Sequence, residues 1–316
     1  MPELNTYLAK LLRLNRAPTK YGRAPHKPVL LLTLLEMIDK GFGNCFAPDV
    51  DLVGIFQENW QLLVHTPNQA DFTQPYYYLQ SEKAGGEPIW QLVALPGCQM
   101  NAHIKSVHRL SQIVSHGAFQ PELYTMLSIP ENRALVRAQL LNCYFPEFAA
   151  AFLQTKQSGA GYYHELEAWV LNEPGAAYKA IRVQNEEEMY VRGGLFKRLV
   201  PQVYRQTCCM SGMQLNSTFG HIYIDACHIV PFSVSHDDRV ANGLALCPNL
   251  HRAFDRGLIT VGEDHRIILS GHIREDAEHH YSLGKLAGQL ILLPGDKHAW
   301  PDQELLDWHR KNCFVA

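Results

Sequence analysis

The stretch Asp225–Asp255, DACHIVPFSVSHDDRVANGLALCPNLHRAFD, most constrains how this chain can fold. An alternating apolar run at Ile222–Ile229 predicts a strand. Pro231 ends this strand, because proline cannot donate a hydrogen bond to a neighbouring strand. A polar loop and an Asn-Gly dipeptide lead into a second short strand at Leu244–Leu246, and Pro248 suits the first turn of a helix. The predicted local order is therefore strand, loop, strand and helix.

Three polar residues stand at set places in this order: His228 on the first strand, Asn242 before the second strand and His251 on the helix. This arrangement resembles the HNH nucleases, whose ββα-metal fold presents a His, an Asn and a His in that order. The words CHIVPF, NGLALC and LHRAFDRGLI are similar to those of McrA-like, modification-dependent (type IV) restriction enzymes. The resemblance implies a metal-dependent DNA endonuclease domain in the C-terminal part of the chain.

The chemistry of phosphodiester hydrolysis requires side chains of these types. A water molecule has to lose a proton near neutral pH, which an imidazole can accept, so His228 is the candidate general base. Asn242 would orient this base or brace the loop. A divalent metal neutralises charge on the scissile phosphate, and the candidate ligands are His251, Asp255 and Asp225, because carboxylate and imidazole suit such an ion. These ligand types admit Mg²⁺, Mn²⁺, Co²⁺, Ni²⁺ or Zn²⁺ without choosing between them.

One departure from the HNH pattern lies beside the candidate base. Many HNH nucleases place the first metal ligand directly before the base, where this chain has Cys227. Asp225 lies further back and would face away from His228 in a regular strand, unless a bulge turns it. The chain has 16 His, so a single His indicates little, and only the ordered set points to a nuclease site. A protein that reads modified DNA without cutting it, with an HNH fold kept for structure alone, stays open.

Composition limits the partners of this chain. The 316 residues carry a net charge of −3, so a DNA-binding surface has to be a local patch. The apolar run Val29–Leu35 is too short to span a bilayer, and the first residues lack a signal-peptide pattern, so we expect a cytoplasmic protein without a membrane partner. The eight cysteines form no C-x-x-C pair, which favours buried thiols. A structural zinc stays open where cysteines gather, at Cys208 or Cys209, Cys227 and Cys247.

A second motif lies in the loop APTKYGRAPHKP, bounded by Pro18 and Pro28. Pro28 favours the start of a helix, and Val29–Asp39 is apolar nearly all round, as in a buried helix. Free backbone N–H groups at such a helix start favour an anion. The loop adds cationic and apolar side chains, namely Lys20, Arg23, His26 and Lys27, and Tyr21, Ala24 and Pro25. This combination suits a DNA phosphate.

The same loop carries a second resemblance, together with QPYYYLQ, IWQL and LLNCYFPEF further along the chain. These words are similar to the sulfur-binding domain of phosphorothioate-dependent restriction enzymes. The resemblance implies that double-stranded DNA with sulfur in place of one phosphate oxygen is the partner. Phosphate or base-edge contacts then fall to Arg23, His26 and Lys27. The sulfur pocket, which should be apolar because sulfur is weakly hydrated, falls to Ala24 and Pro25 with Tyr21 or one of Tyr76, Tyr77 and Tyr78.

The whole sequence predicts an α+β chain, with a mainly helical first part, a small sheet and a C-terminal ββα-metal domain. Helices are predicted at Asp49–Leu63, His103–His116 and Glu131–Phe145. Strands are predicted at Tyr76–Leu79 and Ile89–Leu95, joined by a Gly-Gly turn. Further along, helices are predicted at Tyr162–Leu171 and Glu186–Gln206, a hairpin at Gly257–Ser270 and a helix near the end of the sequence.

We predict three regions with different roles. Residues 1–155 form the sulfur-binding domain, 156–205 a helical linker and 206–316 the endonuclease domain, with the first boundary near the polar stretch QTKQSGAG at Gln154–Gly161. A homodimer is plausible, because two active sites are needed to cut both strands, although no sequence feature shows it. An alternative is a restriction nuclease that reads methylated or hydroxymethylated bases, which would need a pocket for a flipped base or contacts in a groove.

Overall fold

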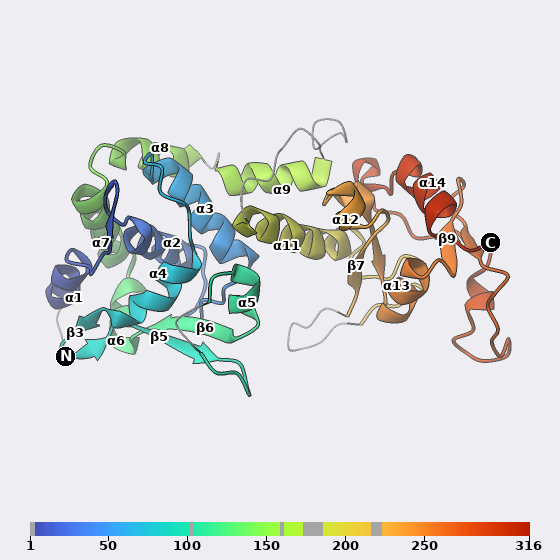
Figure 1. Ribbon diagram of the computed structural model, residues 1–316, viewed down its shortest axis with the longest axis horizontal. Coiled ribbons are helices and arrows are strands. Elements are labelled where there is room, and N and C mark those ends of the chain that lie inside the picture. The colour runs from blue at the N-terminus through green and yellow to red at the C-terminus, as the bar shows by residue number, and fades with distance from the viewer. Residues whose placement is uncertain (1–3, 101–103, 159–160, 173–185, 216–222) are drawn as a thin grey trace. The chain divides into compact units, whose positions relative to one another are not determined.

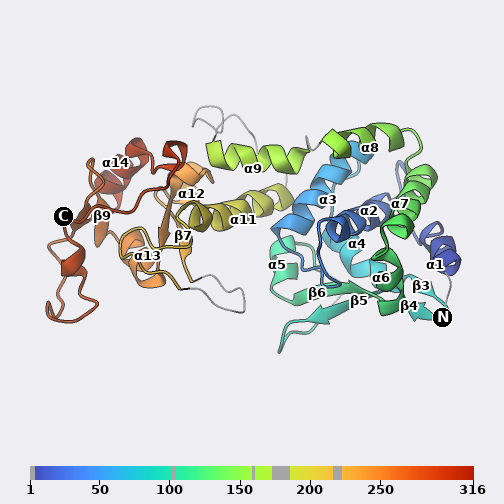
Figure 2. The same cartoon turned by 180° about the vertical axis from the view of Figure 1, so that it is seen from behind.

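The computed structural model describes the chain except for residues 1–3, 101–103, 159–160, 173–185 and 216–222. It combines helices with small two-stranded antiparallel sheets, which confirms the predicted α+β class (Figure 1, and Figure 2 from behind). The chain divides into two compact units. The first comprises Met1–Glu165 and Val183–Val191, and the second comprises Leu166–Arg182 and Arg192–Ala316. The functional regions 1–155, 156–205 and 206–316 stay predictions, because compact units need not coincide with functional domains.

The first unit is mainly helical. Its helices are α1 (Leu4–Leu11), α2 (His26–Asp39), α3 (Val50–Leu63), α4 (Thr73–Tyr78), α5 (Val107–Ser111), α6 (Pro121–Leu127), α7 (Pro130–Tyr144) and α8 (Ala149–Ser158). A short 3₁₀ helix, η1 (Leu79–Ser81), follows α4. The paired strands are β1 (Pro18–Thr19) with β2 (Gly22–Arg23), β3 (Lys83–Ala84) with β4 (Glu87–Pro88), and β5 (Trp90–Ala94) with β6 (Val114–Phe119).

Helix α2 is the centre of this unit. It is buried along nearly its whole length, as its apolar sequence predicts, and it contacts α3, α4 and α7. Helix α3 begins as predicted, because the Asp49 side chain accepts a hydrogen bond from the backbone N–H of Leu52. These two helices fix the loop that leads into α2, since that loop ends on the first turn of a helix that cannot move without opening the core.

The expected strand at Tyr76–Leu79 is wrong, because this segment forms α4 and η1. Phe72, Tyr76 and Leu79 are all buried and follow a helical spacing, so the segment packs one helical face on the core. The Tyr76 hydroxyl donates a hydrogen bond to the backbone oxygen of Phe46, and the Trp90 indole donates to the backbone oxygen of Tyr76. The Gly-Gly turn instead joins β3 to β4.

One other expectation needs correction. The helix predicted over His103–His116 is limited to α5, and Val114 already starts β6, because β6 pairs with β5 in the core; residues 101–103 lie outside the described part. The first residues of the polar stretch QTKQSGAG, 154–158, belong to the last turns of α8, and residues 159–160 lie outside the described part, so the linker stays a prediction. The helix predicted over Glu131–Phe145 is confirmed as α7.

Helices α9 (Tyr162–Asn172) and α11 (Glu186–Val203) have residues in both units. The rest of the second unit is built of short elements. These are β7 (Asp225–His228), α12 (Phe232–Ser235), η2 (Val240–Asn242), β8 (Gly243–Leu246), α13 (Pro248–Asp255), β9 (Ile259–Val261), β10 (Ile267–Leu269), η3 (Leu283–Leu286), η4 (Lys297–Ala299) and α14 (Gln303–Asn312). The hairpin β9–β10 and the helix α14 confirm the predictions for this part. Among the described residues, every helix is too short or too polar to span a lipid bilayer.

Candidate functional site

Strands β7 and β8 and helix α13 form the predicted strand, strand and helix in the second unit. The strands are antiparallel, with Asp225 opposite Leu246 and His228 opposite Gly243. The first predicted strand residue, Ile222, lies outside the described part. Gly243 is extended and starts β8, so it does not serve as a turn glycine. A side chain there would meet Val200 of α11 at 2.5 Å, so the glycine is needed for the close approach of α11.

His228 sits at the end of β7 with a defined orientation. Its ring stacks on Phe196 of α11, with 3.8 Å between ring centroids and 10° between planes. Its Nε2 atom lies 3.0 Å from Oδ1 of Asp238, a residue with 2% of its side chain exposed, whereas the His228 side chain is 24% exposed. A neutral ring that donates from Nε2 to this carboxylate has Nδ1 as its proton acceptor. The arrangement resembles other pairs of a base and an orienting acid.

Asn242 is completely buried and holds the loop that follows β7. Its Oδ1 accepts from the backbone N–H of Val230 at 2.9 Å. Its Nδ2 donates to the backbone oxygens of Val230 (3.0 Å) and Asp237 (2.9 Å). The side chain therefore fixes the loop that carries Asp238, and among the described contacts it has none with the ring of His228. Of the two predicted roles for Asn242, these contacts agree with bracing the loop.

His251 lies on α13 between two carboxylates. Its Nδ1 is 3.1 Å from Oδ2 of Asp225, and its Nε2 is 3.4 Å from Oδ2 of Asp255. The thiol of Cys227 lies on the same side, with Sγ 3.7 Å from Oδ1 of Asp255. Donor atoms of Cys227, His251 and Asp255 all lie within 4.8 Å of one another. A group of imidazole, carboxylate and sulfur donors fits a divalent ion.

His228 and His251 line one cleft of about 290 Å³. The cleft is also bordered by Asp255, Phe232 and His309. The ring of His309 has a fixed position at the wall of this cleft, because it stacks on Phe254 and its Nδ1 lies 2.9 Å from the Thr260 hydroxyl. Burial lowers the pKa of His309, so it adds no charge near neutral pH. The cleft thus brings together the candidate proton acceptor, His228, and two candidate metal ligands, His251 and Asp255.

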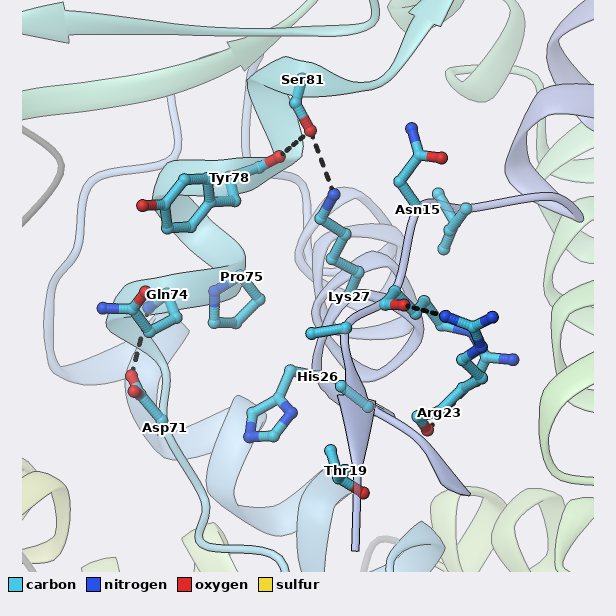
Figure 3. A pocket seen from close by; sticks show the side chains of 14 residues that line it. Asn15, Thr19, Arg23, His26, Lys27, Asp71, Gln74, Pro75, Tyr78 and Ser81 are labelled. Carbon is cyan, nitrogen blue, oxygen red and sulfur yellow. Dashed lines mark hydrogen bonds between the residues drawn. The ribbon is translucent and has the colours of Figure 1, made fainter. Parts of the chain in front are cut away.

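The loop predicted to bind phosphate lines a larger cavity in the first unit, of about 900 Å³ (Figure 3). Figure 3 shows Tyr78 and Pro75 on one side and Arg23 on the other, with His26 and Lys27 between them. The loop itself folds into the β1–β2 hairpin, in which Gly22 takes a positive φ of 108°. The cavity therefore joins the predicted loop to α4, a segment far along the sequence.

Two of the predicted cations, His26 and Lys27, are less available to bind a phosphate than the sequence indicated. Burial lowers the pKa of His26, and its Nε2 donates to the backbone oxygen of Gln69 at 2.9 Å, so the neutral ring is left with an acceptor and no donor for a phosphate. Lys27 is buried and pairs with the fully buried Glu82, which also pairs with Lys10. The cluster of Lys10, Lys27 and Glu82 keeps one net positive charge.

Two arginines supply accessible positive charge at this cavity, which the carboxylate of Asp71 also lines. Arg23, which was predicted, and Arg16, which was not, both line it. Arg23 donates from Nη1 to the backbone oxygen of Arg16 at 3.1 Å, and Arg16 donates from Nη1 to that of Arg23 at 3.5 Å. A guanidinium has five N–H donors, so this mutual contact holds the pair in place and leaves other donors for a ligand.

The predicted apolar residues divide into those inside and those outside the cavity. Ala24 and Tyr78 line it, together with Pro75, which was not predicted. The expectation for Tyr76 is wrong, because its side chain is fully buried in the core and offers no surface to a ligand. Three further predicted residues, Tyr21, Pro25 and Tyr77, are not among the residues that line this cavity. Tyr21 is 48% exposed on the hairpin.

Sequence reasoning missed Asp238, Arg16 and Pro75. Asp238 belongs to a run of charged residues, DDR, in a loop that the sequence analysis described only as polar, and its burial and its contact with His228 single it out. Pro75 precedes the tyrosines that were considered, but it was hidden by the wrong strand assignment. Cys227 was noted as a departure from the HNH pattern and as part of a cysteine cluster that could hold a structural zinc, but not as a partner of His251 and Asp255. The i, i+4 spacing of His251 and Asp255 was the signal in the sequence that these two side chains lie together on one face of a helix.

Comparison with known proteins agrees with this geometry. Residues 208–262 match the HNH endonuclease family. A stretch of 84 residues is 30% identical to the type IV methyl-directed restriction enzyme EcoKMcrA of Escherichia coli (strain K12), over 26% of this chain and 30% of the relative. The chain therefore spans less than a third of the length of this curated relative. The modification dependent TagI restriction endonuclease aligns over 44% of this chain and 42% of that chain, with a TM-score of 0.31 and 20% identity. A structural likeness this weak says nothing about the function of the chain. The second unit of the chain contains an HNH endonuclease domain.

Proposed function

We propose that the chain is a modification-dependent restriction endonuclease that hydrolyses DNA phosphodiester bonds with a divalent metal. The observation that carries this proposal is the single cleft lined by His228 and His251 within a region that matches the HNH endonuclease family. His228 is the proton acceptor, and His251 with Asp255 or Asp225 holds the ion. Two such sites, supplied by two copies of the chain, would cut both strands.

The chain's own residues account for activation of the water. His228 takes a proton from the attacking water at Nδ1, while Nε2 stays hydrogen-bonded to Asp238. Stacking on Phe196 keeps the ring in one plane, and Asn242 fixes the loop that carries Asp238. When bound, the metal neutralises charge that develops on the phosphate and on the leaving oxygen. The test is to incubate plasmid DNA that carries phosphorothioates or modified bases with the full chain and with Mg²⁺, Mn²⁺, Co²⁺, Ni²⁺ or Zn²⁺ in turn. We expect metal-dependent nicking or linearisation of the plasmid. No cleavage with any of these ions would contradict the proposal.

Replacing Asp238 by Asn should slow cleavage while DNA binding is unchanged. The amide can present a donor to Nε2, which favours the wrong tautomer of His228. We expect kcat to fall by at least about tenfold, within the ~10²–10⁴-fold that a positioned base contributes. Single-turnover cleavage measures the fall, and Asp264→Asn, on an exposed turn, is the control. Unchanged cleavage by Asp238→Asn would remove Asp238 from the account.

For recognition, we propose that the cavity in the first unit binds a phosphorothioate of the DNA backbone. Arg16 and Arg23 supply donors and charge for the backbone, and the start of α2 adds a favourable dipole. The apolar surface of Ala24, Pro75 and Tyr78 suits sulfur, which loses little hydration there, whereas an oxygen would lose a hydrogen bond to water. This set keeps Arg23, Ala24 and Tyr78 of the predicted residues and adds Arg16 and Pro75. It omits the other predicted residues, namely Tyr21, Pro25, His26, Lys27, Tyr76 and Tyr77.

A second reading of this cavity is a modified base. The relative that matches part of the chain is called methyl-directed, and a volume of about 900 Å³ would accept a flipped base stacked on Tyr78. Binding assays without metal, on matched duplexes that carry phosphorothioate, methylcytosine, hydroxymethylcytosine or no modification, separate the two readings. Tightest binding to phosphorothioate supports the first, and tightest binding to a modified base supports the second.

Replacing Tyr78 by Ala should reduce the preference for phosphorothioate over plain DNA. The loss of one apolar contact is worth about 1–3 kcal/mol, so we expect the ratio of Kd values to fall by about 5- to 100-fold. Fluorescence anisotropy on both duplexes measures the ratio. Tyr21→Ala, which removes an exposed ring outside the cavity lining, is the matched control and should leave the ratio unchanged. Equal ratios for the two variants would contradict the assignment of Tyr78.

A further inference from the structure

The thiol of Cys227 faces the metal-binding residues of α13. Cys227 pairs with Leu244 in the β7–β8 sheet, and its side chain is fully buried. Side chains alternate along a strand, so Cys227 points to the side opposite His228 and to the same side as Asp225. Its Sγ lies 3.7 Å from Oδ1 of Asp255, beside His251. The sulfur atom of Cys227 therefore lies next to the candidate metal ligands on α13, and Cys227 directly precedes the candidate base, His228, in the sequence.

We propose that Cys227 is a metal ligand, together with His251 and Asp255, and that its sulfur restricts the site to thiophilic ions. This inference rests on the metal-dependent function proposed above. Ligand atoms around one tetrahedral Zn²⁺ lie roughly 3.3–3.8 Å apart, because the bonds to the ion are about 2.0–2.3 Å long. Sγ of Cys227 lies 3.7 Å from Oδ1 of Asp255, and Nε2 of His251 lies 3.4 Å from Oδ2 of the same carboxylate. One donor atom from each of the three residues lies within 4.8 Å of the others, so small side-chain rotations bring them to these spacings.

The same geometry gives Asp225 a different role. His251 turns Nε2 towards Asp255, and its Nδ1 lies 3.1 Å from Asp225. A histidine that binds an ion through Nε2 commonly donates its Nδ1–H to a carboxylate, which fixes the ring and strengthens the ligand. Under this proposal Asp225 is a positioning residue rather than the ligand that the sequence predicted, and Cys227 takes the third protein position.

The consequence is a narrower choice of metal. Mg²⁺ prefers oxygen ligands and binds thiolate poorly, whereas Zn²⁺ and Co²⁺ accept sulfur, nitrogen and oxygen together. On binding, the thiol loses its proton to solvent as sulfur bonds to the ion, so uptake of the metal releases a proton. Of the five ions that the sequence admitted, Zn²⁺ and Co²⁺ fit this donor set best and Mg²⁺ fits it least.

The test is titration of the metal-free full chain with Co²⁺, followed by absorption spectroscopy. We expect one bound Co²⁺ per chain and a thiolate-to-cobalt charge-transfer band in the near ultraviolet, displaced by Zn²⁺ and unaffected by excess Mg²⁺. Cys227→Ser should lose the band, and Cys247→Ser should keep it. Cys247 is a matched control, since it is buried in the same unit but outside the donor group, and serine suits its position before α13.

Two variants separate a ligand from a positioning residue. Asp225→Asn should keep the band while Co²⁺ affinity falls about 10- to 100-fold, the usual effect of removing a carboxylate behind a ligating histidine. His251→Ala should lower affinity further. A band that persists in Cys227→Ser, or Co²⁺ bound without a band in the unmodified chain, overturns the proposal. Should Cys227→Ser fail to fold, X-ray absorption of the Zn²⁺-loaded unmodified chain decides, with one sulfur at about 2.3 Å expected and none overturning the proposal.

These outcomes also separate this inference from the proposed function. A cobalt–thiolate band in a chain that cuts no DNA would support the ligand set and contradict the nuclease. Full cleavage with Mg²⁺ by Cys227→Ser would support the nuclease and contradict the role of the thiolate.

Discussion

Replacing His228 by Ala abolishes cleavage and leaves DNA binding intact, if this imidazole activates the water. A positioned general base contributes about 10²–10⁴-fold to the rate, so we expect a loss of this size in single-turnover cleavage. The variant also loses the ring contact with Phe196 and one partner of the buried Asp238, so some loss of folding stability is expected, and cleavage is compared below the unfolding temperature of the variant. DNA affinity should hold, because the predicted recognition residues lie in the other unit.

His280→Ala is the control for this experiment, since His280 is an exposed histidine of the same unit. It should cleave like the unmodified chain. If His228→Ala cleaves at an unchanged rate, the assignment of the base is wrong. If it loses DNA binding as well as cleavage, His228 acts in binding.

Removal of the metal should have an effect at least as large. Charge stabilisation by a bound ion is worth several kcal/mol, so chelation should reduce cleavage by roughly 10³-fold or more. Returning a divalent ion to the chelated chain should restore activity. His251→Ala removes the proposed ligand between Asp225 and Asp255, so it should lose cleavage to a similar extent, and the same ion concentration should not restore it. Cleavage that survives chelation would contradict a metal-dependent mechanism.

The nuclease platform was predictable because its signals are local. Proline positions, apolar alternation and the Asn-Gly dipeptide lie within one short stretch, and the structure has the same order of β7, β8 and α13. The i, i+4 spacing of His251 and Asp255 fixed their common face on a helix, and their side chains meet at 3.4 Å. The sequence predicted a turn at Asn242-Gly243, whereas the structure needs Gly243 for close packing against Val200. This packing could not be predicted, because Val200 belongs to a helix far away in the sequence.

Partners that come from distant parts of the chain were not predictable. Lys27 looked like a loop cation, and its pairing with Glu82 appears only when the core is assembled. His26 is likewise neutralised by burial and held by Gln69. Asp238 lies in a polar loop whose burial depends on Asn242, and no local pattern distinguishes it from its neighbours. The tyrosines at 76–78 were misplaced because an aromatic-rich run fits a strand or a helix equally well over so short a length.

One measurement tests the central claim most directly: the single-turnover cleavage rate of the full chain on two duplexes that differ by one atom, sulfur or oxygen, at a single phosphate. With a divalent metal present, the account predicts cleavage of the phosphorothioate duplex, much slower cleavage of its plain counterpart, and no cleavage of either by His228→Ala. Equal cleavage of both duplexes by the unmodified chain would contradict recognition of sulfur. Cleavage of neither duplex with any of the five ions would contradict the account as a whole.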